Sequence, residues 1–73
     1  MATALSENCV EQIGTTAGLV WQTLDSDGPM SLAKLCRTVD APRDMVMQAI
    51  GWLAREDKVS IEEGTRGRIV SLV

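Results

Sequence analysis

The stretch from Ser31 to Val59 constrains the fold most, because it holds two short helical patterns separated by a break. Ser31 precedes the first pattern as an N-cap, and Asp40-Ala41-Pro42 interrupts the apolar periodicity before the second. Two amphipathic helices joined by a turn of about three to four residues are typical of a helix-turn-helix. The apolar positions are Leu32, Leu35, Cys36 and Val39 in the first helix and Val46, Ala49, Ile50, Leu53 and Ala54 in the second.

A β-hairpin is expected directly after the second of these helices. After Lys58 the pattern becomes alternating, the segment 64–67 is a turn cluster, and the remainder is rich in β-branched residues. Met30 is expected to form a short strand that pairs with the hairpin, because a hairpin alone is marginally stable in water. The prediction is an α+β winged helix-turn-helix, a single domain of residues 1–73. Its helices are expected at 8–24, 31–39 and 43–56, and its later strands at 59–63 and 67–72.

The first predicted helix carries one apolar face and two internal glycines. Asn8 and Glu11 have the spacing of a capping box, with Ser6 as an alternative cap earlier in the chain. Gly28 should end the helix, and residues 1–6 are expected to be frayed. Trp21 is predicted to anchor the core. Gly14 and Gly18 are predicted to permit close approach of another helix, with a functional groove as the alternative. The core-facing positions are Val10, Ile13, Ala17, Val20, Trp21 and Leu24, with Val70 and Leu72 added from the last strand.

Three segments of the chain resemble a known family. They are IGTTAGLVWQTL, GPMSLAKL and QAIGWLAREDKVSIEE. They are similar to the small stand-alone winged helix-turn-helix domains of bacteria and archaea that form a family of unknown function. The similarity covers nearly the whole chain; Asp40 stands at a position where the family usually has glycine, and Pro42 where it usually has a serine cap. The resemblance implies a fold and leaves the function open.

The composition argues against catalysis. The chain has no His, Tyr or Phe, so Ser-His and Cys-His nucleophiles are excluded, and no phosphate-binding or metalloprotease motif occurs. Two cysteines without histidine cannot form a four-ligand zinc site. Cys9 and Cys36 are expected to be buried thiols, with a disulfide as the alternative. We expect no catalytic, metal-binding or cofactor-binding residue, no membrane span and a cytoplasmic protein.

DNA binding, with a role in transcription regulation, is the first functional hypothesis. In a helix-turn-helix the second helix lies in the major groove, where Gln48 could pair with adenine and Arg43 with guanine. Lys34 and Arg37 could contact the DNA backbone. The predicted nucleic-acid-binding residues are Arg43, Met47, Gln48, Arg55, Lys58, Arg66 and Arg68.

The charge distribution argues against strong DNA binding. The net charge is −3, whereas DNA-binding domains usually present a basic surface. The acidic excess lies in residues 1–29, which hold four acidic residues and no Lys or Arg. Residues 30–58 hold five basic and four acidic residues, and Asp44 should repel phosphate.

Protein interaction or self-association is the second hypothesis. Met47, Gly51 and Trp52 are expected to form an outward strip on the third helix. Trp and Met are enriched at protein interfaces, and glycine lets a partner backbone approach. The alternative for Trp52 is a structural role, in which its ring packs against the wing near Ile69.

Overall fold

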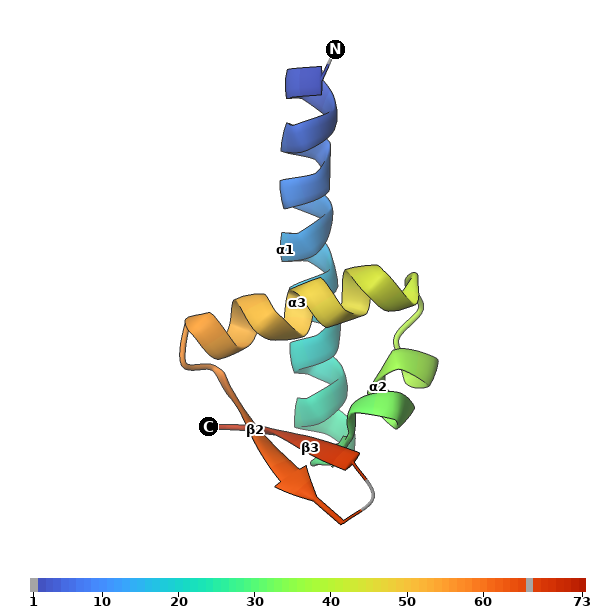
Figure 1. Ribbon diagram of the computed structural model, residues 1–73, viewed down its shortest axis with the longest axis vertical. Helices are drawn as coiled ribbons and strands as arrows, with labels where there is room; N and C mark the ends of the chain where they lie inside the picture. The colour runs from blue at the N-terminus through green and yellow to red at the C-terminus, as the bar shows by residue number, and fades with distance from the viewer. Residues whose placement is uncertain (1, 66) are drawn as a thin grey trace.

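The computed structural model confirms the predicted winged helix-turn-helix. It describes the backbone of residues 2–65 and 67–73 and the side chains of residues 9–65 and 67–73. Figure 1 shows α3 crossing α1, with the sheet and α2 gathered around the C-terminal half of α1. The elements are α1 (Ala2–Asp27), β1 (Met30–Ser31), α2 (Leu32–Thr38), α3 (Arg43–Arg55), β2 (Val59–Gly64) and β3 (Gly67–Leu72).

Helix α1 is longer than predicted at both ends. It begins at Ala2 rather than at residue 8, so Asn8 lies inside the helix and is not its cap. Residues 2–7 contain no Gly or Pro that would stop the helix from extending. The helix continues to Asp27, past the predicted end at residue 24. Gly28 terminates it as expected, with φ 84° and its N–H donated to the Leu24 carbonyl at 2.9 Å. The expectation that residues 1–6 are frayed concerns their motion and stays a prediction.

The helix-turn-helix has the expected caps. The Ser31 hydroxyl oxygen accepts a hydrogen bond from the Lys34 N–H at 3.1 Å, so Ser31 is the N-cap of α2. Pro42, with φ −58°, opens α3, where the missing N–H costs no helical hydrogen bond. Helix α3 ends one residue earlier than predicted, and Asp57 reverses the chain with φ 61° so that β2 can begin.

The three strands form an antiparallel sheet in the order β1-β3-β2. Met30 pairs with Val70, which confirms the predicted short strand, and Val70 also pairs with Ile61. Successive side chains of a strand point to opposite faces. Val70 is fully buried beneath the helices, whereas Ile69, on the opposite face, is exposed.

The core lies where the C-terminal half of α1, α3 and the sheet meet. Val70 belongs to it as predicted, and Leu72 packs against it while half-buried. The prediction for two α1 residues is wrong: Val10 is 56% exposed and Trp21 is 40% exposed. Val10 lies beyond the part of α1 that α3 covers, and Trp21 lies at the edge of the buried stripe. The core residues are Ala17, Val20, Leu24, Met30, Leu35, Val39, Val46, Ala49, Ile50, Leu53, Val59 and Val70.

Both cysteines are free thiols, so the alternative disulfide is not formed. Cys36 is half-buried at the edge of the core, whereas Cys9 is exposed, contrary to the prediction. Cys9 lies on the N-terminal half of α1, where no other described element covers the helix (Figure 1). Within the described residues, no helix is long and apolar enough to cross a membrane.

Two leucine substitutions test this assignment of the core. Leu35 is fully buried, so Leu35→Ala should lower the free energy of unfolding by about 2–5 kcal/mol. Leu19 is 40% exposed, so the same change there should cost less than about 1 kcal/mol. Urea denaturation of both variants, followed by circular dichroism, compares them. Equal losses would contradict the placement of the core.

Candidate nucleic-acid and protein interfaces

Helix α3 has one buried and one exposed face. Val46, Ile50 and Leu53 are buried toward α1 and the sheet. Because each residue advances about 100° around a helix, a set of polar residues and one glycine faces away from the core. No described element covers this outward face, which is where a recognition helix contacts DNA. The outward residues are Asp44, Gln48, Gly51 and Arg55, flanked by Arg43 and Met47, and all six are exposed.

The start of α3 is poorly suited to phosphate. Pro42 occupies the N-cap position, and its side chain has no atom that could accept a hydrogen bond. The first backbone N–H groups of α3 therefore receive no capping hydrogen bond from it. The Asp44 carboxylate supplies one such acceptor, because its Oδ1 accepts a hydrogen bond from the Met45 N–H at 2.8 Å. A negative charge is stabilised at a helix N-terminus, and here it repels an approaching phosphate.

Two of the predicted DNA-contacting cations are paired with acids. Arg68 Nε lies 3.1 Å from Glu63 Oε2, across the β2–β3 register that places these two residues opposite each other. Lys58 Nζ lies 3.5 Å from Glu56 Oε1. The four side chains are between 43% and 77% exposed, so the pairs are weak, but they reduce the local positive charge. Arg66 lies outside the described residues.

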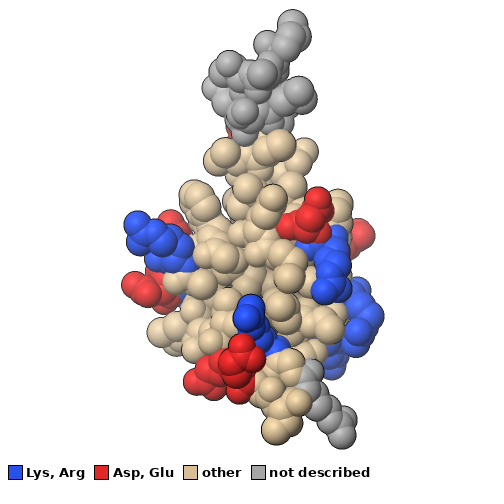
Figure 2. All heavy atoms as spheres, viewed as in Figure 1, with Lys and Arg blue, Asp and Glu red and all other residues tan. Residues whose placement is uncertain are grey.

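The positive charges of the described residues do not form one continuous surface on the face that carries α3. Figure 2 shows Lys and Arg side chains in separate groups, at both sides and near the centre of this face, each with acidic side chains close by. Within the described residues no ion pair involves Arg43 or Arg55, so these two arginines are the cations of α3 that remain available for phosphate or base edges.

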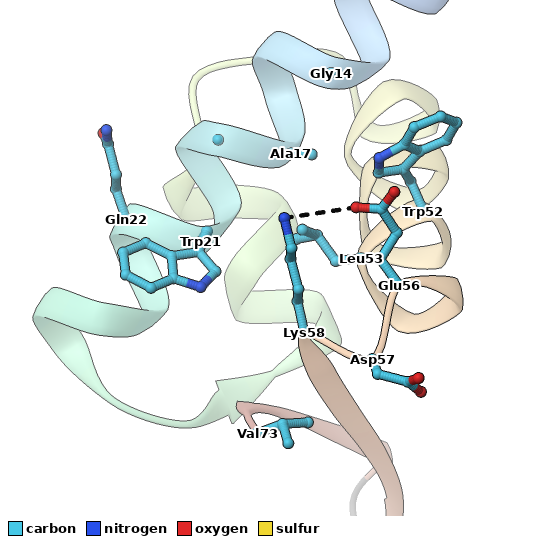
Figure 3. Close-up of a pocket in the computed structure, with 11 residues that line it drawn as sticks. Gly14, Ala17, Trp21, Gln22, Trp52, Leu53, Glu56, Asp57, Lys58 and Val73 are labelled. Atoms are coloured by element: carbon cyan, nitrogen blue, oxygen red, sulfur yellow. Dashed lines mark ion pairs between the residues drawn. The ribbon is translucent and has the colours of Figure 1, made fainter.

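A second candidate surface is a groove between α1 and the C-terminal end of α3, with a volume of about 630 Å³. It contains Trp21 and Trp52, the only aromatic residues of the chain, which are 40% and 46% exposed. Figure 3 shows the Glu56–Lys58 ion pair between the two indole rings. The groove therefore combines two large apolar rings with a central charged pair. Its other lining residues are Gly14, Ala17, Gly18, Gln22, Leu53, Asp57 and Val73.

Trp52 does not pack against the wing as the alternative prediction required. Ile69 pairs with Ser31 and Glu62, so it shares their face of the sheet. That face is opposite the one on which Val70 packs against the helices. The Trp52 ring instead lies beside α1, near Gly14 (Figure 3).

The two glycines of α1 form part of this groove. A Cβ atom built on Gly14 or Gly18 would have no atom within 4 Å, so the predicted close approach of another helix does not occur within the described chain. A groove does lie at these glycines, and its functional role stays a prediction. The sequence contains a signal for the exposure of Trp21. Gly14 and Gly18 lie seven and three residues before it on the same side of the helix, so no side chains there cover the indole ring.

The predicted strip of Met47, Gly51 and Trp52 is divided between two surfaces. Five residues separate Met47 from Trp52, which places them about 140° apart around the helix. Met47 lies beside the outward face of α3, and Trp52 lies in the groove.

Among the described residues, no three His, Cys, Asp or Glu side chains are close enough together to hold a metal ion.

Comparisons with known proteins agree with this architecture. A family model described as a winged helix-turn-helix domain (DUF2582) matches residues 8–72. An uncharacterized protein of Methanocaldococcus jannaschii, MJ1608, is 36% identical over 64 residues, which cover 84% of this chain and 90% of that protein. The solution structure of protein BT2368 from Bacteroides thetaiotaomicron is similar with a TM-score of 0.75 and 34% identity. That match covers 85% of this chain and 76% of the other.

The exposure of both tryptophans predicts that a dissolved quencher reduces their fluorescence in the folded protein. In Trp21→Phe and Trp52→Phe, each of which retains one indole, acrylamide should quench the remaining emission efficiently at low protein concentration, because 40–46% of each side chain meets solvent. The same variants unfolded in urea provide the fully exposed reference. Emission that resists quenching in either folded variant would show that its indole is buried.

Proposed function

Because the chain belongs to this family of winged helix-turn-helix domains, we propose that it binds double-stranded DNA with α3 in the major groove. The observation that carries the proposal is the outward face of α3, where Arg43, Gln48 and Arg55 are all exposed. The wing hairpin β2–β3 follows this helix directly. In this proposal the protein acts without catalysis, as a transcription-regulatory module in the cytoplasm.

The side chains of α3 are chemically suited to reading bases. The Gln48 amide can donate to and accept from adenine in the major groove, and an arginine such as Arg43 can donate two hydrogen bonds to guanine. Helix α3 has 13 residues and is therefore about 20 Å long, enough to lie across the groove. Arg43 and Arg55 lie at its two ends, and Met47 provides an apolar contact next to Gln48.

The charge pattern sets the expected strength of this binding. The net charge of −3, the Arg68–Glu63 pair and Asp44 all oppose association with DNA. We therefore expect a monomer to bind with Kd of about 10⁻⁴–10⁻⁶ M, the range of non-specific binding, and to be sensitive to salt.

Gln48→Ala tests direct readout by α3. If Gln48 contacts a base, this change should reduce the preference for selected over random duplexes by about 1–3 kcal/mol. Gln12→Ala, the same substitution at an exposed position of α1, is the matched control and should have no effect. Fluorescence anisotropy at low salt, with the selected duplexes and with the random pool, measures this preference for both variants. No binding by the unmodified protein at near-millimolar concentration would overturn the proposal.

The Arg68–Glu63 pair provides a second test. Glu63→Gln removes the acid that pairs with Arg68 on the wing, so affinity for all duplexes should rise and the salt dependence should steepen by about one phosphate contact. Glu11→Gln makes the same change in net charge on α1, away from the wing, and should have a smaller effect. Anisotropy titrations at two salt concentrations compare the variants. Identical gains would show that net charge alone governs the binding.

Protein interaction is a second candidate function, favoured by one observation. Both aromatic residues of the chain are nearly half exposed in a single groove, and partly exposed tryptophans are typical anchors of protein interfaces. This surface is separate from the outward face of α3, so the two functions do not exclude each other.

A further inference from the structure

We infer that the groove between α1 and α3 binds the N-terminal half of α1 from a second copy of this chain, in a reciprocal, antiparallel dimer. The inference rests on the second candidate function and does not depend on DNA binding. Each copy would insert its own helix into the groove of the other, which gives a closed two-fold arrangement.

The first argument is the helix that the chain leaves uncovered. Helix α1 has 26 residues, and the protein measures 43 × 22 × 21 Å because the N-terminal turns of α1 project beyond α3 (Figure 1). An isolated helix of about 12–15 residues is only marginally stable in water without a packing partner. Val10, on this projecting part, is 56% exposed. The projecting helix would therefore gain stability if it packed against a surface outside its own chain.

The second argument is that the helix and the groove share one stripe of residues. Val10, Gly14, Gly18 and Trp21 are spaced by four, four and three residues, so they lie along one side of α1, and all four are exposed. An antiparallel two-fold axis near the middle of this stripe places Val10 opposite Trp21 of the partner subunit. It also places Gly14 opposite Gly18 of the partner subunit. Large residues thus face the ends of the stripe, and glycines face its centre.

The third argument is the empty space at the glycines. A glycine inside a helix costs about 0.5–1 kcal/mol relative to alanine, and two of them lie one turn apart in α1. In the described chain nothing lies within 4 Å of a Cβ built at either position. Small residues allow two helix backbones to approach closely, so a second helix over Gly14 and Gly18 would use the space that the monomer leaves open.

The charge of α1 separates self-association from DNA binding. Residues 1–29 hold four acidic residues and no basic ones, so two paired α1 helices repel each other at low salt. Screening by added salt should therefore strengthen the dimer, whereas it weakens contacts with phosphate. Opposite salt responses make the failure of one proposal distinguishable from the failure of the other.

Gly14→Gln is the decisive variant. Open space surrounds the position and glutamine is a better helix former than glycine, so the monomer should remain folded with an unchanged or higher melting temperature. The longer side chain should prevent close approach of the partner helix and weaken the dimer at least about tenfold. Gly51→Gln is the matched control, because Gly51 also lies in a helix with nothing near its Cβ but on the outward face of α3. It should leave the dimer intact.

Sedimentation equilibrium of the full chain, from about 10 μM to 1 mM at low and high salt, measures these effects. The expected result is a monomer–dimer equilibrium that shifts toward the dimer with salt, is lost in Gly14→Gln and persists in Gly51→Gln. An unmodified protein that stays monomeric throughout would overturn the inference. A dimer that survives Gly14→Gln, or that is lost equally in Gly51→Gln, would show that the copies associate through another surface.

Discussion

The packing of α3 against the C-terminal half of α1 determines most other properties of this protein. It buries Val20 and Leu24 of α1 together with Val46, Ile50 and Leu53 of α3, and the sheet closes the same core. Because one stripe of α3 is used in this way, the opposite stripe must face solvent. Because α3 covers only part of α1, the N-terminal turns of α1 remain uncovered and a groove forms beside the crossing. Both candidate interfaces are therefore consequences of one helix–helix contact.

Those parts of the fold that depend on local pattern could be predicted from the sequence. The Ser31 cap, the break at Pro42, the alternation after Lys58 and the pairing of Met30 with the hairpin all follow from residue type and spacing. The errors in the predicted core concern Val10 and Trp21, which have the correct periodicity for a core face but are exposed. Periodicity shows which side of a helix is apolar. It does not show how much of the length of that helix the neighbouring elements of the same chain cover.

The candidate sites were predicted less well, for a related reason. A helical pattern identifies Gln48 and Arg55 as outward residues, but it cannot show that Arg68 pairs with Glu63 across two strands. Nor can it show that Trp52 and Trp21 line the same groove, since they lie far apart in the chain. Contacts between distant segments depend on how the elements cross, and this information is not local. The groove became visible only when α1 and α3 were placed together.

The strand order has a consequence for the synthesis of the protein. Strand β3 is central in the sheet and follows the other strands in the sequence, and within the described residues both β1 and β2 pair with it alone. While the ribosome is still translating this region, β1 has no partner and β2 has no hairpin. The helices can form from local interactions as they emerge, but the sheet must wait for β3. Folding of this domain is therefore completed only after its last strand has left the ribosome, and loss of that strand would leave the other two without any sheet to join.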